Sequence, residues 1–120
     1  MKKENLILDK SFLFSLIAIE LYKKLINVNE YVLSRQFLKS ATSIGANINE
    51  STAAQSKDDF ISKMSIASKE ARETKYWLML LERSNFIQFD YSVLLKEADE
   101  IINILTAIVK TSQHNNGKRQ

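Results

Sequence analysis

The sequence predicts an all-α fold, an antiparallel four-helix bundle with up-down-up-down topology. The 120 residues contain no proline and only two glycines, so few positions interrupt a helix. The connectors between the expected helices are short, which favours antiparallel neighbours. One long segment also repeats apolar or small residues at alternating steps of four and three, which places them on one helix face. These residues are Phe60, Met64, Ala67, Ala71, Thr74, Leu78 and Leu81.

The first helix is expected over residues 9–27, with Asp9 or Ser11 as its N-cap. It is apolar nearly all round, with two stripes on almost opposite sides. One stripe is Phe12, Leu16, Ile19 and Ile26; the other is Phe14, Ile17, Leu21 and Leu25. Three neighbouring helices cannot cover both stripes, so the protein is expected to self-associate. We predict that the second stripe lies at the oligomer interface.

A short connector at residues 27–30 leads to a second helix, expected over residues 31–54. Its inward stripe is Leu33, Phe37, Ala41, Ile44 and Ile48. A strip of small or polar residues lies beside this stripe, namely Ser40, Ser43, Asn47 and Ala54. We interpret the strip as a close helix contact across which Asn47 could hydrogen-bond; a partly wet face is the alternative. Gly45, on the other side of the helix, suggests close passage of a backbone or a ligand.

The third helix is expected over residues 56–83, because Ser56 and Asp59 have the spacing of a capping box. One flank beside its apolar seam combines large apolar residues with carboxylates, a pattern typical of an interface. This flank is Ile66, Glu70, Glu73, Trp77 and Leu80. The alternative is that Trp77 packs within its own bundle.

Residues 84–89 turn the chain, and Asp90 is expected to cap a fourth helix that ends near Ser112. Its seam again alternates steps of four and three, through Leu94, Ala98, Ile101, Leu105 and Ile108. The sequence therefore predicts one domain over residues 1–112, followed by a disordered polar tail over residues 113–120.

Catalytic and metal-binding chemistry has little support in the sequence. There is no cysteine, and the single histidine, His114, falls in the expected tail. Glu70 and Glu73 are a carboxylate pair, but di-iron bundles need Glu-x-x-His pairs. We therefore expect no enzyme activity, no metal site, no cofactor and no small-molecule substrate. No apolar run reaches the roughly 18 residues that span a bilayer, so no membrane partner is expected and a cytoplasmic location is predicted.

The basic residues give one candidate nucleic-acid surface. The net charge is +3, but residues 85–112 carry −2, which leaves +5 on the rest of the chain. A polyanion should therefore meet the second or third helix. The candidate residues are Arg35, Lys39, Lys69, Arg72 and Tyr76, since two cations with an aromatic ring can hold phosphate and stack a base. The alternative is that these charges form solvated faces.

Three segments resemble one known family. They are residues 40–50 (SATSIGANINE), residues 54–61 (AQSKDDFI) and residues 68–78 (SKEARETKYWL). In this order they resemble the bacterial 23S rRNA intervening-sequence proteins, over most of the chain. The resemblance implies an antiparallel four-helix bundle that assembles into a ring-like homopentamer, and an activity that is undefined for most members. A related branch serves diversity-generating retroelements, where a basic pentamer is thought to bind nucleic acid and a reverse transcriptase.

Together these observations favour a non-enzymatic, self-assembling bundle that binds structured RNA or another nucleic acid through its basic surface. Its expected partners are further copies of itself, RNA, and a nucleic-acid-processing protein. The alternative is an oligomeric scaffold for protein interactions that binds no nucleic acid.

Overall fold

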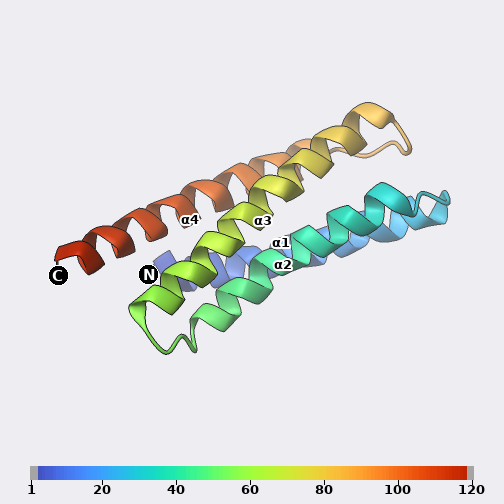
Figure 1. Ribbon diagram of the computed structural model, residues 1–120. Helices are drawn as coiled ribbons and strands as arrows, with labels where there is room; N and C mark the ends of the chain where they lie inside the picture. Colours follow the sequence, from blue (N-terminus) through green and yellow to red (C-terminus); the bar gives the residue numbers. More distant parts are fainter. Residues whose placement is uncertain (1–2, 119–120) are drawn as a thin grey trace.

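The computed structural model describes residues 3–118, which form four helices: α1 (Lys3–Asn27), α2 (Val32–Ser51), α3 (Lys57–Ser84) and α4 (Ser92–Lys118). Each helix packs against the next, and α4 returns to α1, whereas no Cα atoms of the diagonal pairs α1/α3 and α2/α4 come within 8 Å of each other. The predicted four-helix, up-down-up-down bundle is therefore confirmed (Figure 1). The bundle measures 53 × 22 × 22 Å, and the start of α1 and the end of α4 lie at the end that carries the α2–α3 loop.

Local signals explain where α2 and α3 begin. The Glu30 carboxylate accepts hydrogen bonds from the backbone N–H groups of Leu33 (2.7 Å) and Ser34 (2.8 Å), so it satisfies two open donors of α2. Ser56 caps α3 as predicted, because its Oγ accepts from the N–H of Asp59 at 3.0 Å. Asn85 ends α3 at φ 57°, a left-handed conformation that asparagine tolerates better than most residues.

Three predicted boundaries are wrong. α1 begins at Lys3, so Asp9 and Ser11 lie inside the helix and do not cap it. α2 ends at Ser51, three residues before the predicted end. α4 continues to Lys118, so residues 113–118 are helical rather than a disordered tail, and residues 119–120 lie outside the described part. No proline stops α4, and the buried Ser112 keeps its last turns in register with the bundle.

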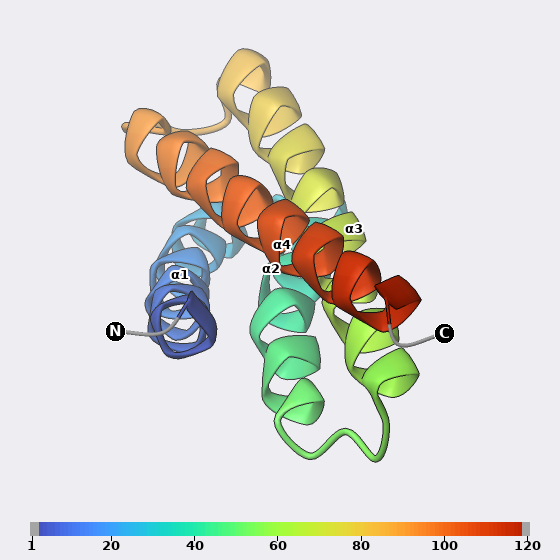
Figure 2. The ribbon, with the colours of Figure 1, turned by 90° about the vertical axis from the view of Figure 1, so that its left-hand side faces the viewer.

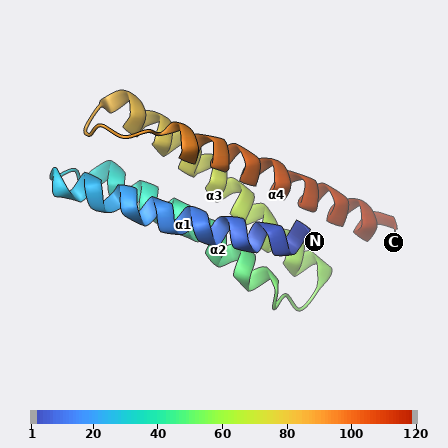
Figure 3. The same cartoon turned by 180° about the vertical axis from the view of Figure 1, so that it is seen from behind.

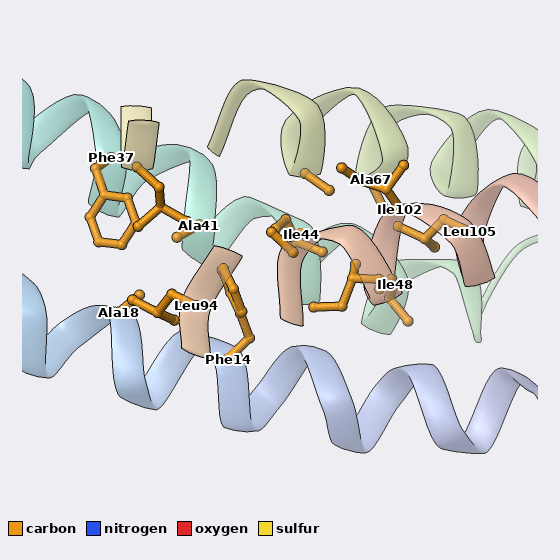
Figure 4. Packing of buried hydrophobic residues seen from close by; sticks show 14 of the residues in the cluster. Phe14, Ala18, Phe37, Ala41, Ile44, Ile48, Ala67, Leu94, Ile102 and Leu105 are labelled. Atoms are coloured by element: carbon orange, nitrogen blue, oxygen red, sulfur yellow. The ribbon is translucent and has the colours of Figure 1, made fainter. Parts of the chain in front are cut away.

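The core follows the predicted seams of α2, α3 and α4. All five seam residues of α4 are buried, as are Phe37, Ala41, Ile44 and Ile48 of α2 and six of the seven seam residues of α3; Phe60 and Leu33 are half-buried. Figure 4 shows side chains of all four helices, among them Phe14, Ile44, Ala67 and Leu94, meeting in the shared interior. The period read from the sequence therefore identifies the inner face of these three helices.

The inner face of α1 was predicted wrongly. Phe14, Leu21 and Leu25 are at most 1% exposed within a single subunit, so they belong to the core and not to an oligomer interface. Of that stripe, only Ile17 is exposed. The buried line also includes Ile7, Ser11 and Ala18 and keeps the steps of four and three that mark the other seams. That longer run is the signal that identifies the inner face.

Small residues allow the helices to approach closely. A Cβ on Gly45 of α2 would lie 3.4 Å from Oγ and 3.6 Å from the carbonyl oxygen of Ser11, so α1 passes close to this position and leaves room for little more than a methyl group. On the opposite side of α2, the buried Ser40 Oγ lies 2.9 Å from the hydroxyl of Thr74 in α3. Asn47 instead donates to the Ser43 carbonyl of its own helix and does not bridge the helices. The predicted close contact therefore holds at Ser40.

Candidate functional site

A large apolar surface lies on the outer side of α1, which runs along the outside of the bundle in the view of Figure 3. Phe12 is 61% and Leu13 is 58% exposed, although both are large apolar residues. With their exposed neighbours they form what we call the α1 patch: Leu6, Phe12, Leu13, Leu16 and Ile17 of α1, and Val93 from the start of α4. α1 therefore carries more apolar surface than its own bundle covers, but this exposed surface lies on the face opposite to Leu21 and Leu25.

A surface pocket of about 210 Å³ adjoins the α1 patch. Leu13, Ile17 and Val93 form its apolar wall, and Phe14 lies at its base. Lys10 and Glu97 form its polar edge. The α1 patch is therefore uneven and offers a recess for an apolar side chain, as interface hot spots do.

An ion-pair cluster borders this pocket and joins α1 to α4. Lys10 Nζ lies 2.8 Å from Oε2 of Glu97 and 2.6 Å from Oε1 of Glu100. The hydrogen bonds to Glu100 and Glu97 raise the pKa of Lys10, and the bond from Lys10 lowers the pKa of Glu100. These residues lie 87 and 90 positions apart in the chain, so the sequence pattern gave no sign of the cluster.

The second predicted interface, the α3 flank of Ile66, Glu70, Glu73, Trp77 and Leu80, is partly open. Ile66 is 39% exposed, whereas Leu80 and Trp77 are half-buried and Trp77 packs against the core. The Trp77 ring donates from Nε1 to Oε2 of Glu73 at 3.1 Å. Burial raises the pKa of Glu70, and repulsion from Glu73 adds to this effect. The flank therefore combines an aromatic ring with a carboxylate that already loses part of its hydration.

The five candidate nucleic-acid residues are all exposed, but they do not form one cluster. Lys39 of α2 and Lys69 of α3 both lie near Glu70, where each favours the charged carboxylate. Arg72 points to the other side of α3 and donates from Nη2 to Oγ1 of Thr106 in α4 at 3.3 Å. Tyr76 is 56% exposed and packs edge-on against Trp77.

Arg35 shows no ion pair or hydrogen bond to the other four candidates within residues 3–118. Glu70 and Glu73 lie beside the cations of α2 and α3, so this face carries both signs of charge. The surface predicted from the basic residues is therefore weaker than their spacing in the sequence suggests.

No metal or membrane feature adds to these surfaces. Within the described residues, no three or more His, Asp or Glu side chains are arranged to hold a metal ion. The same residues contain no helix long and apolar enough to cross a bilayer.

Comparison with known proteins places the chain in a family. The family model of the 23S rRNA-intervening sequence protein matches residues 3–107. The chain belongs to this family. This family member is also 47% identical to a solved protein of unknown function from the S23 ribosomal protein family of Bacteroides thetaiotaomicron VPI-5482, with a TM-score of 0.87. The alignment covers 91% of this chain and 99% of that one. No functionally curated protein matches this family member.

Proposed function

We propose that this protein is a non-enzymatic module that assembles with copies of itself through the α1 patch. The exposure of Phe12, Leu13, Leu16 and Ile17 on one face is the observation that carries this proposal. Full burial of a leucine or phenylalanine side chain contributes about 1.5–3 kcal/mol. Association costs about 4–15 kcal/mol in lost freedom of motion. Several such side chains buried together reach that scale, whereas a single exposed leucine does not.

The surface that receives the α1 patch on a second copy is the α3 flank. α1 and α3 are diagonal helices of the bundle, so these two exposed surfaces lie on different sides of it. Contact between two different surfaces is head-to-tail, and repetition of such a contact closes into a ring when the rotation allows it. The homopentamer implied by the family resemblance is a ring of this kind.

Light scattering on variants tests the assembly. We expect wild-type protein at micromolar concentration to have several times the 13.8 kDa mass of one chain. Leu13→Asp and Leu16→Asp should reduce the mass to that of one chain, because a carboxylate cannot be buried without a partner. Trp77→Asp should weaken the assembly from the α3 side.

Val32→Asp is the matched control, because Val32 is 74% exposed but lies at the start of α2, outside the α1 patch and the α3 flank. It should leave the mass unchanged. A wild-type mass of one chain, or full assembly of the Leu13→Asp variant, would refute the proposal.

Binding of structured RNA is a second candidate function. It is favoured by Lys39 of α2 and Lys69 of α3, which both lie near Glu70, and by the net charge of +3, which each added copy would multiply. Affinity for RNA should fall steeply with added salt, because phosphate contacts release counterions. Lys69→Glu with Arg72→Glu should abolish binding without loss of helicity. If wild-type protein shifts no RNA or DNA at low salt, the module is a scaffold for proteins alone.

A further inference from the structure

A second surface pocket, of about 210 Å³, lies between α3 and α4, and we call it the α3–α4 groove. It shares no residue with the α1 patch or the α3 flank. Five of its six lining residues carry a polar or charged group, set on a lining whose accessible surface is otherwise apolar. These residues are Ser65, Ser68, Arg72, Thr106, Val109 and Lys110.

The contacts of Arg72 hold its guanidinium over this groove. Its Nη2 donates to Oγ1 of Thr106 at 3.3 Å, while the Thr106 hydroxyl donates to the carbonyl of Ile102 at 2.7 Å. Because the hydroxyl proton of Thr106 is already used, its oxygen is set to accept from Arg72. A guanidinium has five N–H donors in a planar fork, so most of them stay available to a ligand.

The hydroxyls of Ser65 and Ser68 are available as further donors. In α2, the hydroxyls of Ser40 and Ser43 turn back to carbonyl oxygens of their own helix. Ser65 and Ser68 make no such hydrogen bond within the part of the chain that the structure describes. They lie three residues apart, so both side chains face the same side of α3.

The charge of the groove is positive. Among residues 5–115, whose side chains the structure describes, Arg72 and Lys110 have no carboxylate within ion-pair distance, and no acidic residue lines the groove. The nearest pair along α3 is Lys75 with Asp99 of α4, at 2.7 Å, in which the two charges offset each other. An anion in the groove would therefore meet two cations without a competing carboxylate.

We propose that the α3–α4 groove binds a phosphate group through the guanidinium fork of Arg72, the ammonium group of Lys110 and the hydroxyls of Ser65 and Ser68. Planar, bidentate recognition of phosphate by arginine is among the stronger hydrogen-bonded arrangements in proteins. Hydroxyl donors complete the shell of a tetrahedral oxyanion. The site requires one subunit and does not depend on assembly. The phosphate can belong to a small phosphate ester or to a nucleic-acid backbone.

Nuclear magnetic resonance of ¹⁵N-labelled full-length protein tests the site with inorganic phosphate as the probe. We expect saturable shifts at residues 65–72 and 106–110, beyond those caused by sodium chloride at equal ionic strength. Arg72→Gln combined with Lys110→Gln should weaken phosphate binding by about tenfold or more, the effect of losing charge-assisted hydrogen bonds. The matched control, Lys24→Gln with Arg83→Gln, removes the same charge at exposed positions outside the groove and should bind phosphate like the wild type.

Two further ligands distinguish the source of the phosphate. Tighter binding of adenosine 5′-monophosphate than of a short single-stranded oligoribonucleotide supports a small phosphate ester, and the reverse order supports a nucleic-acid backbone. A non-saturable response equal to that of chloride would overturn the proposal, as would unchanged binding by the Arg72→Gln, Lys110→Gln variant. Light scattering of this variant should give the wild-type mass, so failure at the groove is separable from failure of the assembly.

Discussion

The side of the bundle between α2 and α3 differs from the side between α1 and α4. α2 and α3 pack along most of their length through small residues such as Ser40, Ala67 and Ala71. Of the four neighbouring pairs, α1 and α4 pack against each other least extensively. The Lys10 cluster joins them beside a pocket. Figure 2, viewed toward one end of the bundle, shows α2 and α3 joined by their loop and α1 on the far side of α2 from α3.

This difference indicates where the bundle is incomplete. Between α2 and α3, side chains such as Ala67 and Ala71 are buried within one subunit. Beside the less extensive contact of α1 with α4, large apolar side chains such as Leu13 and Val93 stay exposed to water. Such a surface is typical of a place where a neighbouring molecule supplies the missing cover.

The largest expected effect compares the same substitution on the two kinds of surface. Leu78→Ala empties a fully buried position in the α3 seam and should lower the free energy of unfolding by about 2–5 kcal/mol at every protein concentration. Leu13→Ala should change an isolated subunit by no more than about 0.5 kcal/mol. Its loss should grow with protein concentration, because it weakens association. Urea unfolding at several concentrations measures both, and equal, concentration-independent losses would place Leu13 in the core.

The second prediction concerns how closely α1 approaches α2. Gly45→Leu should cost about 1–3 kcal/mol, because the side chain would overlap the Ser11 backbone. Gly45→Ala fits in ordinary van der Waals contact and should add up to about 1 kcal/mol through helix propensity. Ala46→Leu, at the exposed neighbouring position, is the control and should be tolerated. Thermal unfolding distinguishes the three, and a harmless Gly45→Leu would show that the approach is loose.

The third prediction examines the polar contact inside the α2–α3 side. Thr74→Val keeps the shape of the side chain but removes the hydroxyl that lies 2.9 Å from Oγ of Ser40, and should cost about 1 kcal/mol. Thr74→Ser keeps the hydroxyl and serves as the comparison in urea unfolding. A more stable Thr74→Val variant would mean that packing alone holds these two helices together.

The smallest effect is expected at Lys10. Lys10→Gln should lower the Tm by a few degrees at most, since partly exposed ion pairs contribute little. The pKa of Lys10 is raised, so its contribution is complete below the usual 10.5 and is lost as pH rises through the raised value. The pKa of Glu100 is lowered, so its contribution is present above 4.5 and is lost as pH falls through the lowered value.

The difference in Tm between wild type and Lys10→Gln should therefore be largest between pH 4.5 and 10.5 and shrink on either side. Lys23→Gln removes an exposed pair with Glu20 and is the control, with no expected change. A flat pH profile for the Lys10→Gln difference would contradict the role of the cluster in joining α1 to α4.

The sequence was sufficient for the fold but not for every surface. Steps of four and three identified the seams of α2, α3 and α4, because a buried helix face imposes that period. The same rule did not separate the two faces of α1, since both are apolar and only packing decides between Phe12 and Phe14. The role of Glu30 was missed because it precedes the N-cap residue Tyr31, and glutamate is not among the usual N-capping residues.

The candidate surfaces show a similar division. The exposure of Lys69, Arg72 and Tyr76 follows from their positions away from the seam, and the structure agrees. Lys69 lies on the α2 side of α3, and Arg72 lies on the α4 side. This arrangement depends on which helix packs against each side of α3, and local sequence patterns do not show that. The partners of Lys10 lie 87 and 90 residues away, beyond the reach of local patterns.

The position of the chain ends has a consequence for what an assembly displays. Four antiparallel helices return the chain to its starting end, so the start of α1 and the end of α4 lie at the same end of the bundle as the α2–α3 loop (Figure 1). In a closed ring whose symmetry axis runs along the helices, every terminus would emerge on one rim. A domain fused to either end would then crowd that rim, and the turns after α1 and α3 would remain open on the other.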